Sequence, residues 1–208
     1  MEQQWLTWAK QLQALSSTGL FFTEDPYDQE RYEQVAAIAN GMLASIANQP
    51  VAVVESLISD FAKGYATPRV DVRGAVLRNQ QVLLVREGTD GLWTLPGGFA
   101  DIGVSPKENV EKEIREEAKL DVTAYGLYGI RHKARHEYDP DVRDFYKLFF
   151  LCRCKDEREP TASGVETLEV GFFDCDALPP LSRGRTIEQD VRDAFEYEKN
   201  GRRLVFCD

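Results

Sequence analysis

Cysteine and histidine are scarce in this sequence. It contains four cysteines and two histidines among 208 residues. Cys152 and Cys154 would share one face of a strand, with no second cysteine pair at a matching spacing. A disulfide framework or a structural zinc site is therefore the weaker interpretation, and we expect free thiols.

Long hydrophobic runs are also missing. No apolar stretch reaches the roughly 18 residues that a membrane-spanning helix needs. The chain starts with the polar sequence MEQQWLTWAK, which lacks the basic and then apolar order of a secretion signal. We therefore expect a cytoplasmic protein without a membrane segment.

Positive charge is in deficit. Lys and Arg total 25 against 35 Asp and Glu, which gives a formal net charge of -10. Such a chain repels long polyanions, so general nucleic-acid binding is disfavoured. A small anionic substrate stays possible, because a metal ion and a local basic patch can overcome the global field at close range.

The first 66 residues have the apolar spacing of short helices. We expect helices over residues 5–18, 26–48 and 51–63, with stops at Thr18-Gly19, at Asn48-Gln49-Pro50 and at Gly64. Apolar residues of the first helix fall on one face: Trp5, Trp8, Leu12 and Leu15. A domain of this size is marginal alone. It should pack against the rest of the chain or against a second copy of itself.

From Thr67 onward the pattern is that of a mixed α/β domain, which we assign to residues 67–208. Alternating apolar residues predict strands near 70–77, 82–85, 122–130, 145–154, 168–173 and 204–207. Helices are expected over about 105–119 and around Val191, where Thr186 could cap the second one. Interleaved strands and helices predict a mixed sheet between helical layers.

The segment 95–122 carries the candidate chemistry. Ser105, Pro106 and Glu108 are typical of a helix start, with a hydroxyl cap, a proline in the first position and a carboxylate in the third. At about 100° per residue, three carboxylates then share one arc of this helix: Glu113, Glu116 and Glu117. A cluster of hard oxygen ligands suits Mg²⁺ or Mn²⁺.

The same helix has a plainer interpretation. Lys112, Arg115 and Lys119 could simply pair with the glutamates on a solvated face. The preceding Pro96-Gly97-Gly98 favours the metal site instead, because glycines let the backbone approach a ligand closely. A strand, a Gly-Gly loop and a carboxylate helix together indicate a platform for a diphosphate and a metal ion.

This segment resembles the Nudix box, which reads Gly, five residues, Glu, seven residues, then Arg-Glu-hydrophobic-any-Glu-Glu-any-Gly-hydrophobic. Six positions match: Gly98, Glu113, Ile114, Glu116, Glu117 and Leu120. Three depart from it, because Val104 stands for the first Glu, Lys112 for the Arg and Lys119 for the late Gly. Resemblance extends over about residues 67–208 and implies a Nudix-type α/β/α sandwich, preceded by a small all-α domain.

The resemblance implies a hydrolase that splits a nucleoside diphosphate derivative with Mg²⁺ or Mn²⁺. Glu113, Glu116, Glu117 and the Gly97 carbonyl would bind metal, with Gly97 and Gly98 beside the substrate. The general base would be Glu116, Glu117 or, slightly favoured, Glu166, which is equally well read as a solvated loop residue. A basic island could hold the substrate or be a solvated loop: Arg131, Arg135 and His136.

Residues 2–66 resemble the N-terminal extension of a Nudix subgroup that includes CDP-choline and ADP-ribose pyrophosphatase-like enzymes. This similarity implies a homodimer and a small-molecule substrate such as CDP-choline or ADP-ribose. Two alternatives remain. One is RNA-end processing or exonuclease activity in the same site, which the net acidity disfavours. The other is a non-catalytic nucleotide-binding domain, for which the departures at Val104 and Lys112 are the argument.

Overall fold

A computed structural model describes residues 3–58, 65–164, 166–201 and 205–208. The chain divides into two compact units, which are described separately. One unit contains Met1–Arg69 and Ala134–Phe145, and the other contains Val70–Lys133 and Tyr146–Asp208. The boundary between residues 66 and 67 stays a prediction.

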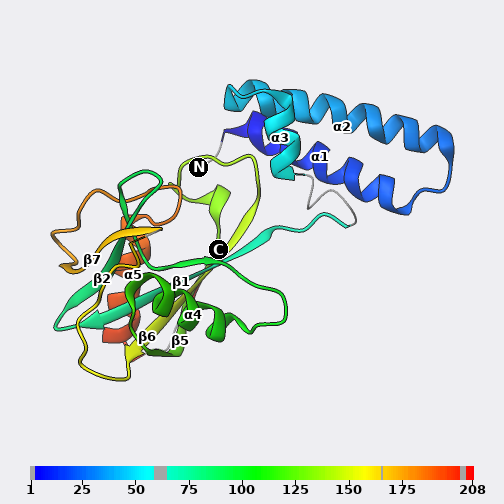
Figure 1. The fold of residues 1–208 in the computed structure, drawn as a ribbon. Coiled ribbons are helices and arrows are strands. Elements are labelled where there is room, and N and C mark those ends of the chain that lie inside the picture. The colour runs from blue at the N-terminus through cyan, green and yellow to red at the C-terminus, as the bar shows by residue number, and fades with distance from the viewer. Residues whose placement is uncertain (1–2, 59–64, 165, 202–204) are drawn as a thin grey trace. The chain divides into compact units, whose positions relative to one another are not determined.

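Three helices form most of the first unit (Figure 1): α1 (Gln4–Phe22), α2 (Pro26–Ala47) and α3 (Val51–Ile58). The Asp25 carboxylate accepts hydrogen bonds from the backbone N–H groups of Tyr27 and Asp28, which fixes the start of α2. The small core contains Leu6, Ala9, Leu43, Ala44 and Val54.

The predicted end of the first helix at Thr18-Gly19 was wrong, because α1 continues to Phe22. Gly19 permits close packing instead of a stop. A Cβ atom at this position would lie 2.4 Å from ring atoms of Tyr32 on α2. The second helix ends as predicted, at Asn48 in a left-handed conformation. The expected continuation of the third helix, with Gly64 as its stop, lies outside the described residues.

No single described helix is long and apolar enough to cross a membrane. By length and composition alone, α2 and most of α3 would pass this test if they were taken together. These two segments, Pro26–Ala47 and Val51–Leu57, are bent by 107° relative to each other. The cytoplasmic location stays a prediction.

The second unit contains a mixed eight-stranded sheet in the order β3-β2-β1-β6-β5-β8, with β4 paired to β1 and β7 paired to β2. Strands β5 and β8 pair in parallel, whereas the pairs β1–β2, β1–β4, β2–β3, β2–β7 and β5–β6 are antiparallel. The strands are β1 (Arg69–Arg78), β2 (Gln81–Glu87), β3 (Trp93–Thr94), β4 (Gly97–Phe99), β5 (Val122–His132), β6 (Phe145–Cys154), β7 (Thr167–Asp174) and β8 (Phe206–Cys207). This confirms the predicted α/β class. The short strands β3 and β4 were not predicted, and Leu204 lies outside the described residues.

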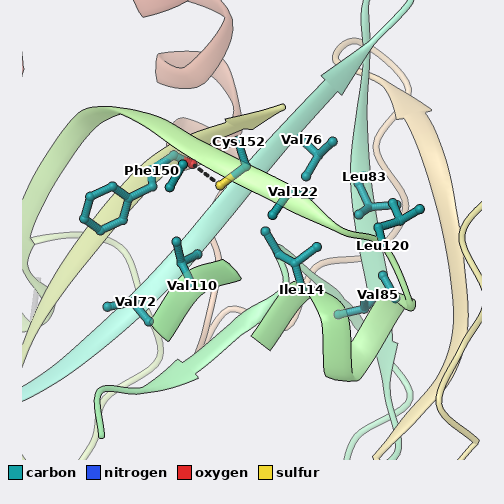
Figure 2. Packing of buried hydrophobic residues seen from close by; sticks show 12 residues of the cluster. Val72, Val76, Leu83, Val85, Val110, Ile114, Leu120, Val122, Phe150 and Cys152 are labelled. Atoms are coloured by element: carbon teal, nitrogen blue, oxygen red, sulfur yellow. Dashed lines mark hydrogen bonds between the residues drawn. The ribbon is translucent and has the colours of Figure 1, made fainter. Parts of the chain in front are cut away.

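Helix α4 (Pro106–Ala118) covers one face of this sheet, as Figure 2 shows. Its Val110 and Ile114 pack against a buried cluster that includes Val72, Val122 and Cys152. Gly74 on β1 makes this contact possible, because a Cβ atom there would lie 2.6 Å from Ile114. The sheet thereby fixes which face of α4 remains available for chemistry.

Helix α5 (Glu188–Lys199) covers the opposite face, where Tyr128 on β5 donates a hydrogen bond to the Asp190 carbonyl. Thr186 does not cap this helix, contrary to the sequence-based expectation. Ile187 is the N-cap residue, and its N–H donates to the Asp190 carboxylate at 2.8 Å. The Thr186 hydroxyl instead bonds to the backbone N–H of Leu95, on a distant part of the chain.

Candidate active site

The predicted carboxylate helix is present and its start is confirmed. The Ser105 hydroxyl accepts from the Glu108 N–H, and the Glu108 carboxylate accepts from the Ser105 N–H at 3.0 Å. The helix ends at Lys119, which adopts a left-handed conformation with φ 56°. This conformation explains why the box has glycine here, since glycine reaches it without a steric cost.

Glu117 is the most enclosed carboxylate of the box. Its side chain is 8% exposed, and its Oε2 atom accepts a hydrogen bond from the Gly97 N–H at 2.9 Å. Burial raises the pKa of Glu117 to about 8, although Arg73 and the Gly97 bond oppose this shift, and the charges of Glu87 and Glu113 add to it. The last turn of α4 is therefore joined directly to the Gly-Gly segment.

Neighbouring atoms lie so close to residues 97 and 98 that both positions favour glycine, which has no side chain. Gly97 has φ 144°, and a Cβ atom on it would lie 2.0 Å from the Val72 carbonyl oxygen. At Gly98 a Cβ atom would lie 3.0 Å from a carboxylate oxygen of Glu113. The two glycines thus let β4 fit between β1 and the carboxylate helix.

Glu113 and Glu116 lie on the same helix. Burial raises the pKa of the half-buried Glu113, and the nearby charge of Glu116 raises it further. Glu116 is exposed, with a carboxylate oxygen 3.9 Å from the Lys112 ammonium. Within the part of the chain that the structure describes, no three His, Cys, Asp or Glu side chains are grouped closely enough to hold one metal ion. Joint metal binding by the three glutamates stays a prediction.

The donor set nevertheless fits a divalent cation in its chemistry. Glu113 and Glu117 are carboxylates whose charged forms are disfavoured by burial and by neighbouring negative charge. A cation between such groups relieves both effects, and hard oxygen ligands suit Mg²⁺ or Mn²⁺.

Arg73, which the sequence did not reveal, lies beside this site. Its guanidinium donates to both carboxylate oxygens of Asp71, at 2.9 and 3.0 Å, and Lys147 donates to Asp71 at 2.9 Å. Burial alone would lower the pKa of Arg73, but Asp71 and, more weakly, Glu117 and Glu87 raise it. Asp71, two residues earlier on β1, could have indicated its ion pair with Arg73, whereas the contact of Arg73 with Leu95 joins distant segments.

Glu87, at the end of β2, was also missed. Burial raises the pKa of Glu87, and the negative charges of Asp90 and Glu166 raise it further. The positive charges of Arg185 and Arg73 lower this pKa but do not cancel the increase. The exposed Glu166 is connected to this strand end, because its carbonyl accepts from the Gly88 N–H at 2.7 Å. Pairing of β2 with β7 therefore brings the predicted base candidate next to Glu87, whose charge in turn affects Glu117.

The basic island is split between the two units. Arg131 is 5% exposed, and its guanidinium forms ion pairs with Asp190 and Asp193 on α5. Arg135 is exposed and His136 is half-buried, and both belong to the unit that contains the N-terminal helices. Substrate binding by Arg131, Arg135 and His136 stays a prediction, and Arg131 is already engaged by two carboxylates.

The structure also shows what stands in place of the missing charged pair of the box. The Lys112 ammonium donates to the Asp101 carboxylate at 2.7 Å, and the Asp101 N–H donates to the Asn109 side chain at 3.2 Å. Val104 is 37% exposed. Asp101 therefore supplies Lys112 with a carboxylate partner from a different position in the loop, so Lys112 is paired without a glutamate at position 104.

Comparison with known proteins matches both parts of the chain to family models. Residues 67–195 match the NUDIX domain, and residues 3–58 match the UDP-X-like N-terminal oligomerisation domain. The chain is 40% identical over 197 residues to the Bacillus subtilis protein named "Putative ADP-ribose pyrophosphatase YjhB", which covers 95% of this chain and 93% of that protein.

Two crystal structures are also similar. A UDP-X diphosphatase matches with a TM-score of 0.62 and 29% identity, over 98% of this chain and 98% of that one. An ADP-ribose pyrophosphatase from Streptococcus suis matches with a TM-score of 0.60 and 38% identity, over 68% of this chain and 100% of that one.

Proposed function

We propose that this chain, which belongs to the Nudix family, hydrolyses the diphosphate bond of a nucleoside diphosphate derivative with the help of Mg²⁺ or Mn²⁺. Hydrolysis of a diphosphate bond agrees with the names of its relatives, an ADP-ribose pyrophosphatase and a UDP-X diphosphatase. The proposal rests mainly on the enclosed Glu117 carboxylate. This carboxylate accepts a hydrogen bond from the Gly97 N–H, and the Glu113 carboxylate lies close to the neighbouring Gly98.

In this proposal Glu113, Glu116 and Glu117 hold the metal, together with the Gly97 carbonyl. When bound, the cation would neutralise charge on the diphosphate and lower the pKa of the attacking water. The chain's own contribution is orientation. The Gly97 N–H fixes the Glu117 carboxylate, and Gly98, which has no side chain, lets the Glu113 carboxylate lie close to the β4 backbone.

Glu166 is the proposed general base. It is exposed at the start of β7, and its charge acts on Glu87 beside the box. A base must come within hydrogen-bond reach of the water it deprotonates, and a loop residue can meet this requirement when substrate binds. Glu116 and Glu117 are the competing candidates. Glu166→Gln should then lower kcat with a small effect on KM, whereas loss of a metal-binding glutamate should also raise the Mg²⁺ concentration needed for half-maximal activity.

The substrate is best identified with a panel of related compounds. ADP-ribose, CDP-choline and a UDP-sugar would be incubated with the enzyme and either Mg²⁺ or Mn²⁺, and the released products separated by chromatography. We expect hydrolysis of at least one compound, with ADP-ribose as the first candidate because two relatives carry that name. Hydrolysis of capped RNA alone would favour RNA-end processing, and binding without hydrolysis would favour a nucleotide-binding role.

A homodimer formed through the N-terminal helices is the proposed assembly. Residues 3–58 match an oligomerisation domain, and α1 leaves large apolar side chains exposed, with Trp5 63% and Leu15 66% accessible. An apolar stripe of this kind is typical of an interaction surface. Light scattering should give twice the chain mass of 23.6 kDa. Leu15→Glu should shift the protein toward the monomer, while Gln29→Glu at an exposed position of α2 should not.

A further inference from the structure

Two buried side chains from distant parts of the chain hold the segment that precedes the glycine pair. The Arg73 Nη1 atom on β1 donates to the Leu95 carbonyl at 3.1 Å. The Thr186 hydroxyl, just before α5, accepts from the Leu95 N–H at 3.1 Å and lies 2.8 Å from the Thr94 hydroxyl. Both side chains are almost completely buried, so water does not compete for these bonds.

Arg73 is itself held firmly. Asp71 binds its guanidinium through both carboxylate oxygens, and Lys147 binds Asp71 in turn. A bidentate pair fixes the plane of a guanidinium as well as its position. The third guanidinium nitrogen, Nη1, is therefore aimed at the Leu95 carbonyl by a rigid support within the sheet.

These contacts leave no free backbone polar group between the Leu95 N–H and the Gly97 N–H. Thr186 takes the Leu95 N–H, Arg73 takes the Leu95 carbonyl, and the Pro96 carbonyl accepts from the Gly74 N–H at 2.9 Å. Proline has no N–H. The next donor along the chain is the Gly97 N–H, and it is bonded to Glu117.

We propose that Arg73 and Thr186 are positioning residues for the active site, which fix the backbone of residues 95–97 so that the Gly97 N–H holds the Glu117 carboxylate in its working orientation. This inference rests on the proposed function of the same site. Neither residue is a catalytic group. Each acts through the Leu95 peptide, and misplacement of a catalytic group by even about 1 Å can lower turnover on the order of 10²-fold.

Thr186→Val tests the threonine with little change in shape, because valine replaces the hydroxyl with a methyl group. We expect amide hydrogen exchange at Leu95 and Gly97 to become roughly tenfold faster, and kcat to fall by roughly tenfold or more with KM nearly unchanged. Thr186→Ser keeps the hydroxyl and should restore both properties. Thr123→Val, at an exposed position of β5, is the matched control and should change neither.

Arg73→Lys tests the second positioning residue in the same way. Lysine keeps the charge but cannot bind Asp71 through two donors and reach Leu95 as well. Exchange at Gly97 should again become faster, whereas Arg78→Lys on the same strand should leave it unchanged, because Arg78 bonds to Glu159 and the Arg158 carbonyl instead. All assays are run well below the midpoint of thermal unfolding of each variant.

Amide exchange and Mn²⁺ binding measured by calorimetry need no substrate, so they separate this inference from the proposed function. Faster Gly97 exchange and weaker Mn²⁺ binding in Thr186→Val, with recovery in Thr186→Ser, would support positioning even if no tested compound is hydrolysed. A folded Thr186→Val protein with wild-type exchange at Gly97 and wild-type Mn²⁺ affinity would overturn it. Equal losses in Thr186→Ser and Thr186→Val would overturn it as well, because the hydroxyl would then not be the cause.

Discussion

The carboxylate of Glu117 accepts a hydrogen bond from the backbone N–H of Gly97 at 2.9 Å, across 20 residues of sequence. This bond joins the end of α4 to the edge strand β4 and places an enclosed carboxyl group beside Arg73. The glutamate helix and the glycine pair, which the sequence predicted to form one platform, are therefore joined by a direct hydrogen bond.

Replacement of Glu117 by Gln should lower turnover on the order of 10²-fold or more, since it removes a preorganised carboxylate that a bound cation would keep ionised. The Gln carbonyl can still accept the bond from Gly97, so the fold should be kept. Glu116→Gln should have an effect of similar size. Steady-state kinetics after chelator treatment and metal resupply measure both, with Glu196→Gln on α5 as an exposed control. Full activity of Glu116→Gln and Glu117→Gln would refute the assigned roles.

Lys119→Gly should stabilise the protein by about 0.5–1 kcal/mol, because it removes the steric cost of a side chain at a left-handed position. The exposed bond from the Lys119 ammonium to the Glu116 carbonyl is a minor loss. Urea unfolding of both proteins measures the difference. Lys107→Gly, inside the first turn of the same helix, should have the opposite sign. A destabilised Lys119→Gly protein would show that the helix end is not strained.

Val104→Glu should change the free energy of unfolding by less than about 0.5 kcal/mol, because this side chain is 37% exposed. It should also leave activity at low Mg²⁺ unchanged, since Lys112 is already paired with Asp101. Activity measured as a function of Mg²⁺ concentration in the wild type and the variant tests this prediction. A marked gain for the variant would mean that the valine is a defect in metal binding.

The buried Asp71 carboxylate should make stability depend on pH in acid. Burial alone would raise the pKa of Asp71, but Arg73 and Lys147 lower it from 3.8 to about 2. Because the folded value lies below the unfolded one, the stabilisation is present above about pH 4 and is lost as the pH falls toward about 2, by on the order of 2 kcal/mol in all.

This acid dependence can be isolated with Asp71→Asn. The difference in unfolding free energy between wild type and the variant should shrink as the pH is lowered from about 6 to about 2.5. Urea unfolding at each pH measures it, with the exposed Asp156→Asn as a control. A difference that stays constant over this range would contradict an ionised Asp71 in the folded protein.

Features that depend on neighbouring residues in the chain could be predicted from the sequence. Helix α4 and its Ser105 cap follow from residues within one turn of each other, and the left-handed Lys119 stands at the glycine position of the box. Contacts between distant segments could not be predicted in this way. Thr186 has the residue type of a helix cap, yet its hydroxyl bonds to Leu95 because the fold brings the two residues together.

Exposure was the other limit of the sequence-based interpretation. Val104 is apolar, yet it is 37% exposed, and the Lys112 ammonium of α4 pairs with Asp101 in the preceding loop. Arg131 was predicted either to hold substrate or to lie in a solvated loop, but α5 supplies two carboxylates that engage it. Whether a polar side chain is exposed or paired depends on neighbours that only the folded chain provides.

The most direct test of the account is hydrolysis of ADP-ribose in ¹⁸O-labelled water with Mg²⁺ or Mn²⁺, followed by mass spectrometry of the products. We expect AMP and ribose 5-phosphate, with one ¹⁸O atom in the phosphate that water attacked. The products should disappear when the metal is chelated, and Glu117→Gln should form them far more slowly. Absence of hydrolysis of ADP-ribose, CDP-choline and UDP-sugars by the folded, metal-supplied enzyme would contradict the assignment of this site as a nucleoside diphosphate hydrolase.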